Sequence, residues 1–176
     1  MKLNLNFDHY LNGDPIPEVQ DSAQWVNLTT GAWCYYNNDS ANGAIYGKLY
    51  NWFAVTDPRG LAPKGWYIPN YDECMALTTY LGGEKVCGGK LKEKGTDHWL
   101  SPNTGATNES GFTALPGGFR SYEGEFDALG YLGNWWTITA YNDSLAWFRE
   151  LDNEYIYCFC NYKHKNYALS VRCLKD

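Results

Sequence analysis

The passage that most restricts the fold is SPNTGATNESGFTALPGGFR, residues 101–120, which is dense in turn-forming residues. Its large apolar anchors are only Phe112, Leu115 and Phe119. A long irregular passage inside a folded domain is usually ordered by side-chain hydrogen bonds or carries function. The composition agrees with such a fold, because 8 Trp, 15 Tyr and 7 Phe stand beside 18 Gly and 7 Pro. These proportions favour short strands and many turns over a helical bundle.

Three segments before this passage have helical character. Residues 21–28 are expected to form a short helix, and residues 44–54 carry apolar side chains at helical spacing. The clearest helix begins after Asn70, which forms a variant of the capping box with Glu73 three residues later. The pair Gly82–Gly83 is expected to end it.

Strands dominate the C-terminal part of the chain. Residues 132–139, 144–151 and 167–173 are predicted to form three strands of an antiparallel sheet. We therefore predict an α+β domain with two or so helices, a small antiparallel sheet and long ordered loops. Residues 1–24 are extended and polar and are expected to be an N-terminal arm or the end of a linker, while residues 25–176 form the domain.

Charge and hydropathy exclude several classes of function. The net charge is −6 and the chain has no long basic run, so nucleic acid is not an expected partner. No apolar run is long enough to span a bilayer, and no signal peptide is visible in this chain, so membrane insertion is not expected.

Residue spacing also argues against catalysis and cofactors. The six cysteines form no CxxC pair and the three histidines are scattered, so we expect no metal and no other cofactor. The even cysteine count is compatible with disulfides and with free thiols alike. No Ser-His-Asp set, paired-carboxylate signature or phosphate loop is present, and the protein is not expected to be an enzyme.

Seven segments together point to one known family. In chain order they are YGKLYNWFAV, PKGWYIPNYDECMALTTYLGG, GGKLKEKGTDHW, SPNTGATNESGFTALPGGFR, LGYLGNWW, AWFREL and LSVRCLKD. In their order and spacing they resemble the Fibrobacter succinogenes major paralogous domain, over roughly residues 30–176. That family is related to the formylglycine-generating enzymes, whose fold is a variant of the C-type lectin fold. The resemblance therefore implies a C-type-lectin-like domain.

Two chemistries of that fold lack their motifs in this chain. The formylglycine-generating enzymes use a redox-active cysteine pair, but Cys158 and Cys160 lie outside any corresponding motif. Calcium-dependent lectins of this fold use EPN or QPD loops followed by WND, none of which occurs here. Asp143 and Asp152 alone are weak evidence for calcium. Glycan binding without calcium, through exposed aromatic side chains, stays open.

The resemblance also implies a possible source of sequence variation. Related C-type-lectin-like domains serve as variable proteins of diversity-generating retroelements, in which a reverse transcriptase miscopies adenines in the C-terminal part of a binding gene. Every residue of YIYCFCNY, residues 155–162, is an Asn or can arise from adenine changes in an Asn codon. Lys163 and Lys165 cannot arise in this way and would be fixed positions. Related domains at the ends of phage tail fibres imply display on a virion tail or an extracellular surface.

Strand alternation predicts which side chains form the binding face. If the segment is extended, the odd-numbered residues from Tyr155 to Asn161 share one face, and Ile156, Cys158 and Cys160 share the inner one. The predicted ligand-binding residues are Asn134, Thr137, Tyr141, Asn142, Phe148, Asp152, Asn153, Tyr155, Tyr157, Phe159, Asn161, Tyr162, His164 and Asn166.

The sequence as a whole predicts a non-catalytic domain that recognises a host surface protein or a glycan. Tyr supplies a large contact area for little rotamer entropy, and Asn supplies adaptable hydrogen bonds, as in antibody binding sites. One alternative is a structural fibre module that chiefly forms homo-oligomers. Another is a lectin-like domain that binds glycans and is not diversified.

Overall fold

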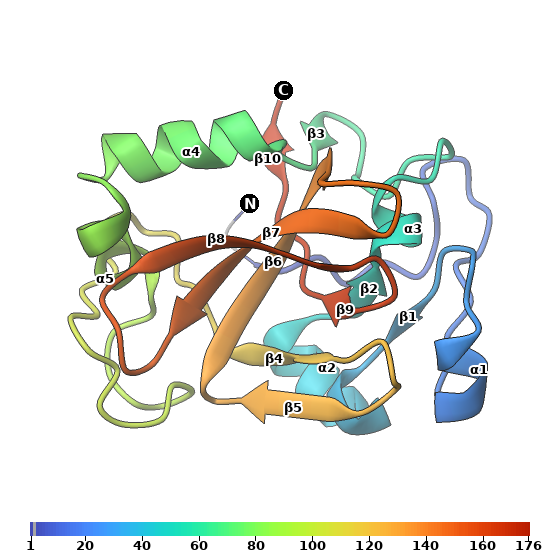
Figure 1. Ribbon diagram of the computed structural model, residues 1–176, viewed down its shortest axis with the longest axis horizontal. Helices are drawn as coiled ribbons and strands as arrows, with labels where there is room; N and C mark the ends of the chain where they lie inside the picture. Colours follow the sequence, from blue (N-terminus) through green and yellow to red (C-terminus); the bar gives the residue numbers. More distant parts are fainter. Residues whose placement is uncertain (2) are drawn as a thin grey trace.

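Three antiparallel sheets and five α-helices form the part of the chain that the computed structural model describes, residues 1 and 3–176 (Figure 1). The five-stranded sheet contains, in spatial order, β1 (Trp33–Cys34), β2 (Leu49–Asn51), β9 (Ala168–Leu169), β4 (Gly117–Arg120) and β5 (Phe126–Leu129). The three-stranded sheet contains β6 (Leu132–Ala140), β7 (Leu145–Asp152) and β8 (Cys158–His164). The strands β3 (Trp66–Tyr67) and β10 (Leu174–Lys175) pair with each other. The predicted α+β class is confirmed.

The helices are short, and the described residues contain five of them where two or so were expected. They are α1 (Ser22–Val26), α2 (Ser40–Tyr46), α3 (Trp52–Val55), α4 (Tyr71–Tyr80) and α5 (Glu84–Leu91), with a 3₁₀ turn at Tyr36–Asn38. Among these described helices, none combines the length and the apolar character needed to cross a membrane.

The helix α4 forms as its sequence predicts. The Asn70 Oδ1 accepts a hydrogen bond from the Glu73 N–H at 2.9 Å, and the Glu73 Oε2 accepts one from the Asn70 N–H at 2.8 Å. These reciprocal bonds satisfy two N–H groups that would otherwise lack a partner at the helix start. The helix ends where Gly82 and Gly83 adopt φ values of 102° and 94°, a region that favours glycine.

The single helix predicted over residues 44–54 is wrong. The helix α2 ends at Tyr46, and Gly47 follows with a φ of 76°. The next residues form β2, which pairs with β9 from the far end of the chain. Asn51 then starts α3, because its Oδ1 accepts the Ala54 N–H at 3.0 Å. A left-handed glycine and a long-range strand pairing therefore override the helical spacing of the apolar residues.

The described residues of the segment 1–24, which we expected to be an arm or the end of a linker, pack against the rest of the domain. Leu5, Tyr10 and Ile16 are buried in the main hydrophobic core. The Leu5 N–H donates to the Val171 carbonyl at 2.8 Å. This segment therefore contributes directly to the core.

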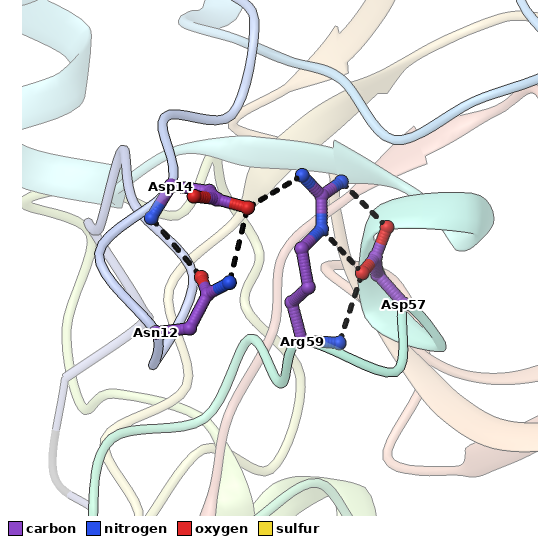
Figure 2. Close-up of polar contacts among 4 residues, drawn as sticks. All are labelled: Asn12, Asp14, Asp57 and Arg59. Atoms are coloured by element: carbon purple, nitrogen blue, oxygen red, sulfur yellow. Dashed lines mark hydrogen bonds and ion pairs between the residues drawn. The ribbon is translucent and has the colours of Figure 1, made fainter.

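A polar cluster fastens the same segment to the loop after α3 (Figure 2). The Arg59 guanidinium donates to Asp57 through Nε and Nη2, each at 2.9 Å, and through Nη1 to Asp14 at 3.2 Å. Asn12 donates to the same Asp14 carboxylate at 3.0 Å. The hydrogen bonds from Arg59 lower the pKa of Asp57 to about 2. The carboxylates of two chain segments thus share one guanidinium.

The C-terminal strands are arranged differently from the prediction. Residues 167–173 do not form an antiparallel strand beside β6 and β7. The strand β9 lies between β2 and β4 in the five-stranded sheet, and Ser170 makes an isolated parallel bridge with Trp135 of β6. The third strand next to β7 is β8, and the two pair from Leu151 with Cys158 to Leu145 with His164. A short connection between β7 and β8 favours their pairing as a hairpin over pairing of β7 with the more distant residues 167–173. The predicted inward positions of Leu169, Val171 and Cys173 are confirmed, since all three are fully buried.

Candidate functional site

The unusual aromatic segment forms the turn before β8 and the strand β8 itself, at the edge of the three-stranded sheet. The strand order β6-β7-β8 makes β8 an edge strand, and no other strand among the described residues pairs with its outer flank (Figure 1). Tyr155, Tyr157 and Tyr162 are 47%, 39% and 42% exposed. An edge strand presents side chains on both faces of its sheet, so β8 can form a surface that wraps around this edge.

One face of this edge carries an aromatic triad, Tyr155, Tyr157 and Phe159. The rings of Tyr155 and Tyr157 are 6.0 Å apart, and each meets Phe159 edge to face, at 6.1 and 5.9 Å between centroids. Cys158 points the other way and is 3% exposed. Phe159 and Cys158 thus lie on opposite faces of β8, as alternation predicts, whereas Tyr155 and Tyr157 lie in the turn before the strand.

The helix α5 packs against the backbone that carries the triad. The Gly89 N–H donates to the Ile156 carbonyl at 3.0 Å. A Cβ on Gly88 would lie 2.1 Å from the Tyr157 carbonyl oxygen, so only glycine allows this approach. The Lys92 Nζ, which is fully buried, donates to the carbonyl oxygens of Thr104, Asp152 and Tyr155 at 2.8 to 3.0 Å. The exposed rings thus stand on a fixed backbone.

The opposite face carries an aromatic quartet, Tyr71, Tyr141, Trp147 and Tyr162. The rings of Tyr141 and Tyr162 stack on each other. Each makes an edge-to-face contact with Trp147, with ring centroids 5.2 Å apart for Tyr141 and 5.7 Å apart for Tyr162. The ring centroid of Tyr71, the first residue of α4, lies 4.8 Å from that of Trp147. The quartet joins α4, the β6–β7 turn and β8 into one partly exposed apolar surface.

Two residues of the quartet, Tyr71 and Trp147, were not among the predicted site residues. Trp147 lies opposite Tyr162 in the β7–β8 ladder, on the same face of the sheet. The pairing of β7 with the segment 158–164 would have revealed Trp147, but the sequence favoured a different partner strand. No local signal connects Tyr71 to this surface, because its contact depends on the position of α4.

Five predicted site residues have buried side chains and do not belong to the exposed surface. They are Asn134, Thr137, Phe148, Asn153 and Asn166. The Asn153 Nδ2 donates to the Leu100 and Ser101 carbonyls, and the Asn166 Nδ2 donates to the Leu28 carbonyl at 2.9 Å. These two amides connect distant loops, which explains why the side chains of Asn153 and Asn166 lie inside the domain.

Four further predicted residues flank the two aromatic clusters. The side chains of Asn142 and Asp152 accept hydrogen bonds from nearby backbone N–H groups and thereby shape the turns at the ends of β7. Asn161 is exposed, and its Oδ1 accepts the Tyr162 N–H at 2.8 Å. The His164 ring lies 5.6 Å from the ring of Tyr122.

An open groove of about 410 Å³ lies beyond the end of β8. Its lining includes His164, Lys165, Asn27, Asp143 and the apolar ring of Phe53. The lining also includes Val26 and Leu28, so polar and apolar side chains both face the groove. The groove continues the exposed surface past His164.

The two lysines of the segment pack against its supporting residues. The Lys163 Nζ lies over the rings of Phe119, Phe148 and Tyr167, at 4.4 to 4.9 Å from their centroids. The Lys165 Nζ lies 4.5 Å from the centroid of Trp52 and donates to the Asp143 carbonyl at 2.8 Å. Both cations therefore help to hold β8 on the domain.

Comparison with known proteins identifies the family of the chain. The family model described as the Fibrobacter succinogenes major domain matches residues 1–175, which include the N-terminal segment. No curated protein and no solved structure matches the chain. The resemblance carried by the seven segments is thus confirmed, and the chain belongs to the Fibrobacter succinogenes major domain family.

Proposed function

We propose that this protein is a non-catalytic ligand-binding domain whose binding surface is built on β8. The observation that carries the proposal is the concentration of partly exposed aromatic rings around β8 and the turn before it, with the triad on one side and the quartet on the other. Rings held in mutual contact lose little further rotamer entropy when a ligand binds. The ligand is a host surface protein or a glycan, and the domain is displayed on a phage tail fibre or a cell surface.

The arrangement of the lysines supports the further proposal that this surface is diversified by adenine mutagenesis. Lys163 and Lys165, which adenine changes in an Asn codon cannot produce, pack on the supporting residues. Tyr155, Tyr157 and Tyr162, which such changes can produce, are exposed. A diversified surface needs this division between a constant framework and replaceable outer side chains. Within the described residues, Cys158 and Asn166 are buried and belong to the framework.

One experiment separates recognition from assembly. The unaltered chain, Tyr157→Ala, Tyr162→Ala and the control Tyr80→Ala are tested for binding to a glycan panel and to whole bacterial cells. Tyr80 is 86% exposed on α4 and outside both aromatic clusters, so it controls for the loss of any surface ring. We expect the first two variants to lose binding while light scattering gives an unchanged mass. If the variants lose assembly but keep binding, the result would favour the alternative hypothesis of a structural module that forms homo-oligomers.

A second experiment addresses diversification alone. The DNA flanking the gene is sequenced and searched for a near-copy of the last few dozen codons. We expect a copy whose differences fall almost only at its adenines and map to the codons of Tyr155, Tyr157 and Tyr162. A locus with neither a copy nor a reverse transcriptase gene would leave the glycan-binding alternative without diversification.

A further inference from the structure

The groove beyond the end of β8 is built from four segments that lie far apart in the chain. Residues 26–29 come from the end of α1 and the loop after it, and Phe53 comes from α3. Residues 143–144 belong to the β6–β7 turn, and residues 164–166 follow β8 to its end. The volume of about 410 Å³ falls within the range of about 300 to 1,000 Å³ that is usual for small-molecule sites.

Asn166 supplies this groove with a hydrogen-bond acceptor that is fixed and unpaired. Its side chain is 6% exposed, and its Nδ2 donates to the Leu28 carbonyl at 2.9 Å and to the Val26 carbonyl at 3.4 Å. These two carbonyls determine which end of the amide carries the nitrogen, and therefore where the Oδ1 lies. The Oδ1 accepts no hydrogen bond from the residues that the structure describes, yet it is not sealed from solvent. Because Asn166 lines the groove, this oxygen can accept from a donor placed there.

Two neighbouring side chains add groups that donate. The His164 Nδ1 accepts the Asn166 N–H at 3.3 Å, so the proton of the neutral ring lies on Nε2, which is then a donor. The Ser144 hydroxyl, which can donate and accept, also lines the groove. Donors and acceptors therefore stand side by side in this groove.

The charges that line the groove are of both signs. The lining contains one carboxylate, from Asp143, and one ammonium group, from Lys165. The Lys165 Nζ donates to the Asp143 carbonyl and lies over the ring of Trp52, so the surrounding domain already holds this cation. One charge of each sign favours neither an anion nor a cation, and we therefore expect a neutral ligand.

We propose that this groove binds one neutral sugar unit of a glycan, with the apolar face of the sugar on Phe53 and one of its hydroxyl groups donating to the Asn166 Oδ1. A sugar ring combines hydroxyl groups that donate and accept with an apolar C–H face, and the groove offers both polar groups and the half-buried Phe53 ring. The inference rests on the proposed ligand-binding role of the β8 surface, which the groove continues, and it names a neutral saccharide as the class of ligand.

The test uses the methyl glycosides of glucose, galactose, mannose, N-acetylglucosamine and rhamnose, each added at millimolar concentration to the full chain and followed by saturation-transfer NMR. EDTA is present throughout, because the proposed contacts use no metal ion. We expect at least one of these neutral sugars to bind, and to bind more tightly than glucuronate and glucosamine, which carry opposite charges. Phe53→Ala is expected to weaken this binding about tenfold or more, because the sugar loses the ring on which it packs. Tyr80→Ala, which removes an exposed ring outside the groove, is the matched control.

A second variant keeps the test decisive if Phe53→Ala does not fold. Thr29→Trp places a large ring in the groove from an exposed position and is expected to abolish sugar binding, whereas Thr30→Trp, at the next exposed position outside the groove, is expected to keep it. Absence of binding by every sugar would overturn the inference, and so would binding that Thr29→Trp leaves unchanged. Tyr157→Ala is expected to keep the binding of single sugars, since Tyr157 lies before the opposite end of β8. A chain that binds no sugar but loses cell binding in Tyr157→Ala would therefore overturn this inference alone and leave the proposed function standing.

Discussion

Tyr141 and Tyr162 stack face to face, with ring centroids 4.1 Å apart and ring planes inclined by 8°. Tyr141 follows β6, and Tyr162 lies on β8, so the contact links parts of the sheet that β7 separates. The rings are 47% and 42% exposed. The same pair can therefore stabilise the edge of the sheet and offer a flat apolar surface to a ligand.

The change Tyr162→Ala is expected to lower the free energy of unfolding by about 1 to 2 kcal/mol, because it removes the contacts with Tyr141 and Trp147. Urea unfolding measures this loss, and Tyr80→Ala, on the exposed face of α4, is expected to change it by less than about 0.5 kcal/mol. A double-mutant cycle with Tyr141→Ala isolates the stacking energy. A coupling energy of zero would show that the stack adds nothing.

The change Lys92→Met is expected to cost more than about 3 kcal/mol of unfolding free energy, since three carbonyl oxygens lose their donor inside the domain. Hydrogen exchange of the amides from 152 to 158 is expected to accelerate in the same variant. Lys94→Met, at an exposed position of the following loop, serves as control. A loss below about 1 kcal/mol would mean that the backbone of the triad is held by α5 alone.

The acid stability of the protein is expected to depend on Asp57. Its folded pKa of about 2 lies below the ordinary value of 3.8, so its contribution to stability is complete above pH 3.8 and is lost as the pH falls through about 2. The Asp57→Asn variant is expected to have a lower urea midpoint than the unaltered chain at neutral pH. Between pH 3.8 and about 2, its midpoint is expected to change less. Asp97→Asn, at an exposed loop position, is the control. Parallel pH profiles for Asp57→Asn and the unaltered chain would contradict this.

Thiol titration tests the state of the cysteines. All six are free, so the denatured chain is expected to give six reactive thiols with or without prior reduction. The native protein is expected to react slowly near neutral pH. Burial raises the pKa of Cys34 to about 12 and that of Cys74 to about 11, and Cys87, whose pKa the hydrogen bond with Cys158 lowers, is fully buried. Two fewer thiols before reduction would reveal a disulfide and reopen the question of redox chemistry.

The parts of the fold that the sequence predicts well are those with local causes. The capping residues of α4 and the glycines that end it all lie within residues 70–83. The strand β2 was missed because its pairings, with β1 earlier in the chain and with β9 over a hundred residues further along, leave no local signal. For the same reason the segment 167–173 was assigned to the wrong sheet, since alternation shows that a strand exists but does not choose its neighbour.

The candidate site was predictable to a similar extent. Alternation alone separates the exposed rings of the triad from the buried Cys158. The burial of Asn153 and Asn166 gave no signal, because asparagine is typical of turns and the carbonyls that these amides bind lie far away in the sequence.

The position of β8 also affects how this protein avoids associating with itself. The open flank of an edge strand can pair with any other extended chain, and here that strand is rich in aromatic residues, which favour aggregation. The Asn161 Oδ1 occupies the Tyr162 N–H and so removes one donor from that flank. An edge strand pairs with one neighbouring strand, whereas an inner strand such as β7 pairs with two. Its side chains therefore tolerate replacement more widely than those of β7, provided that the edge stays protected.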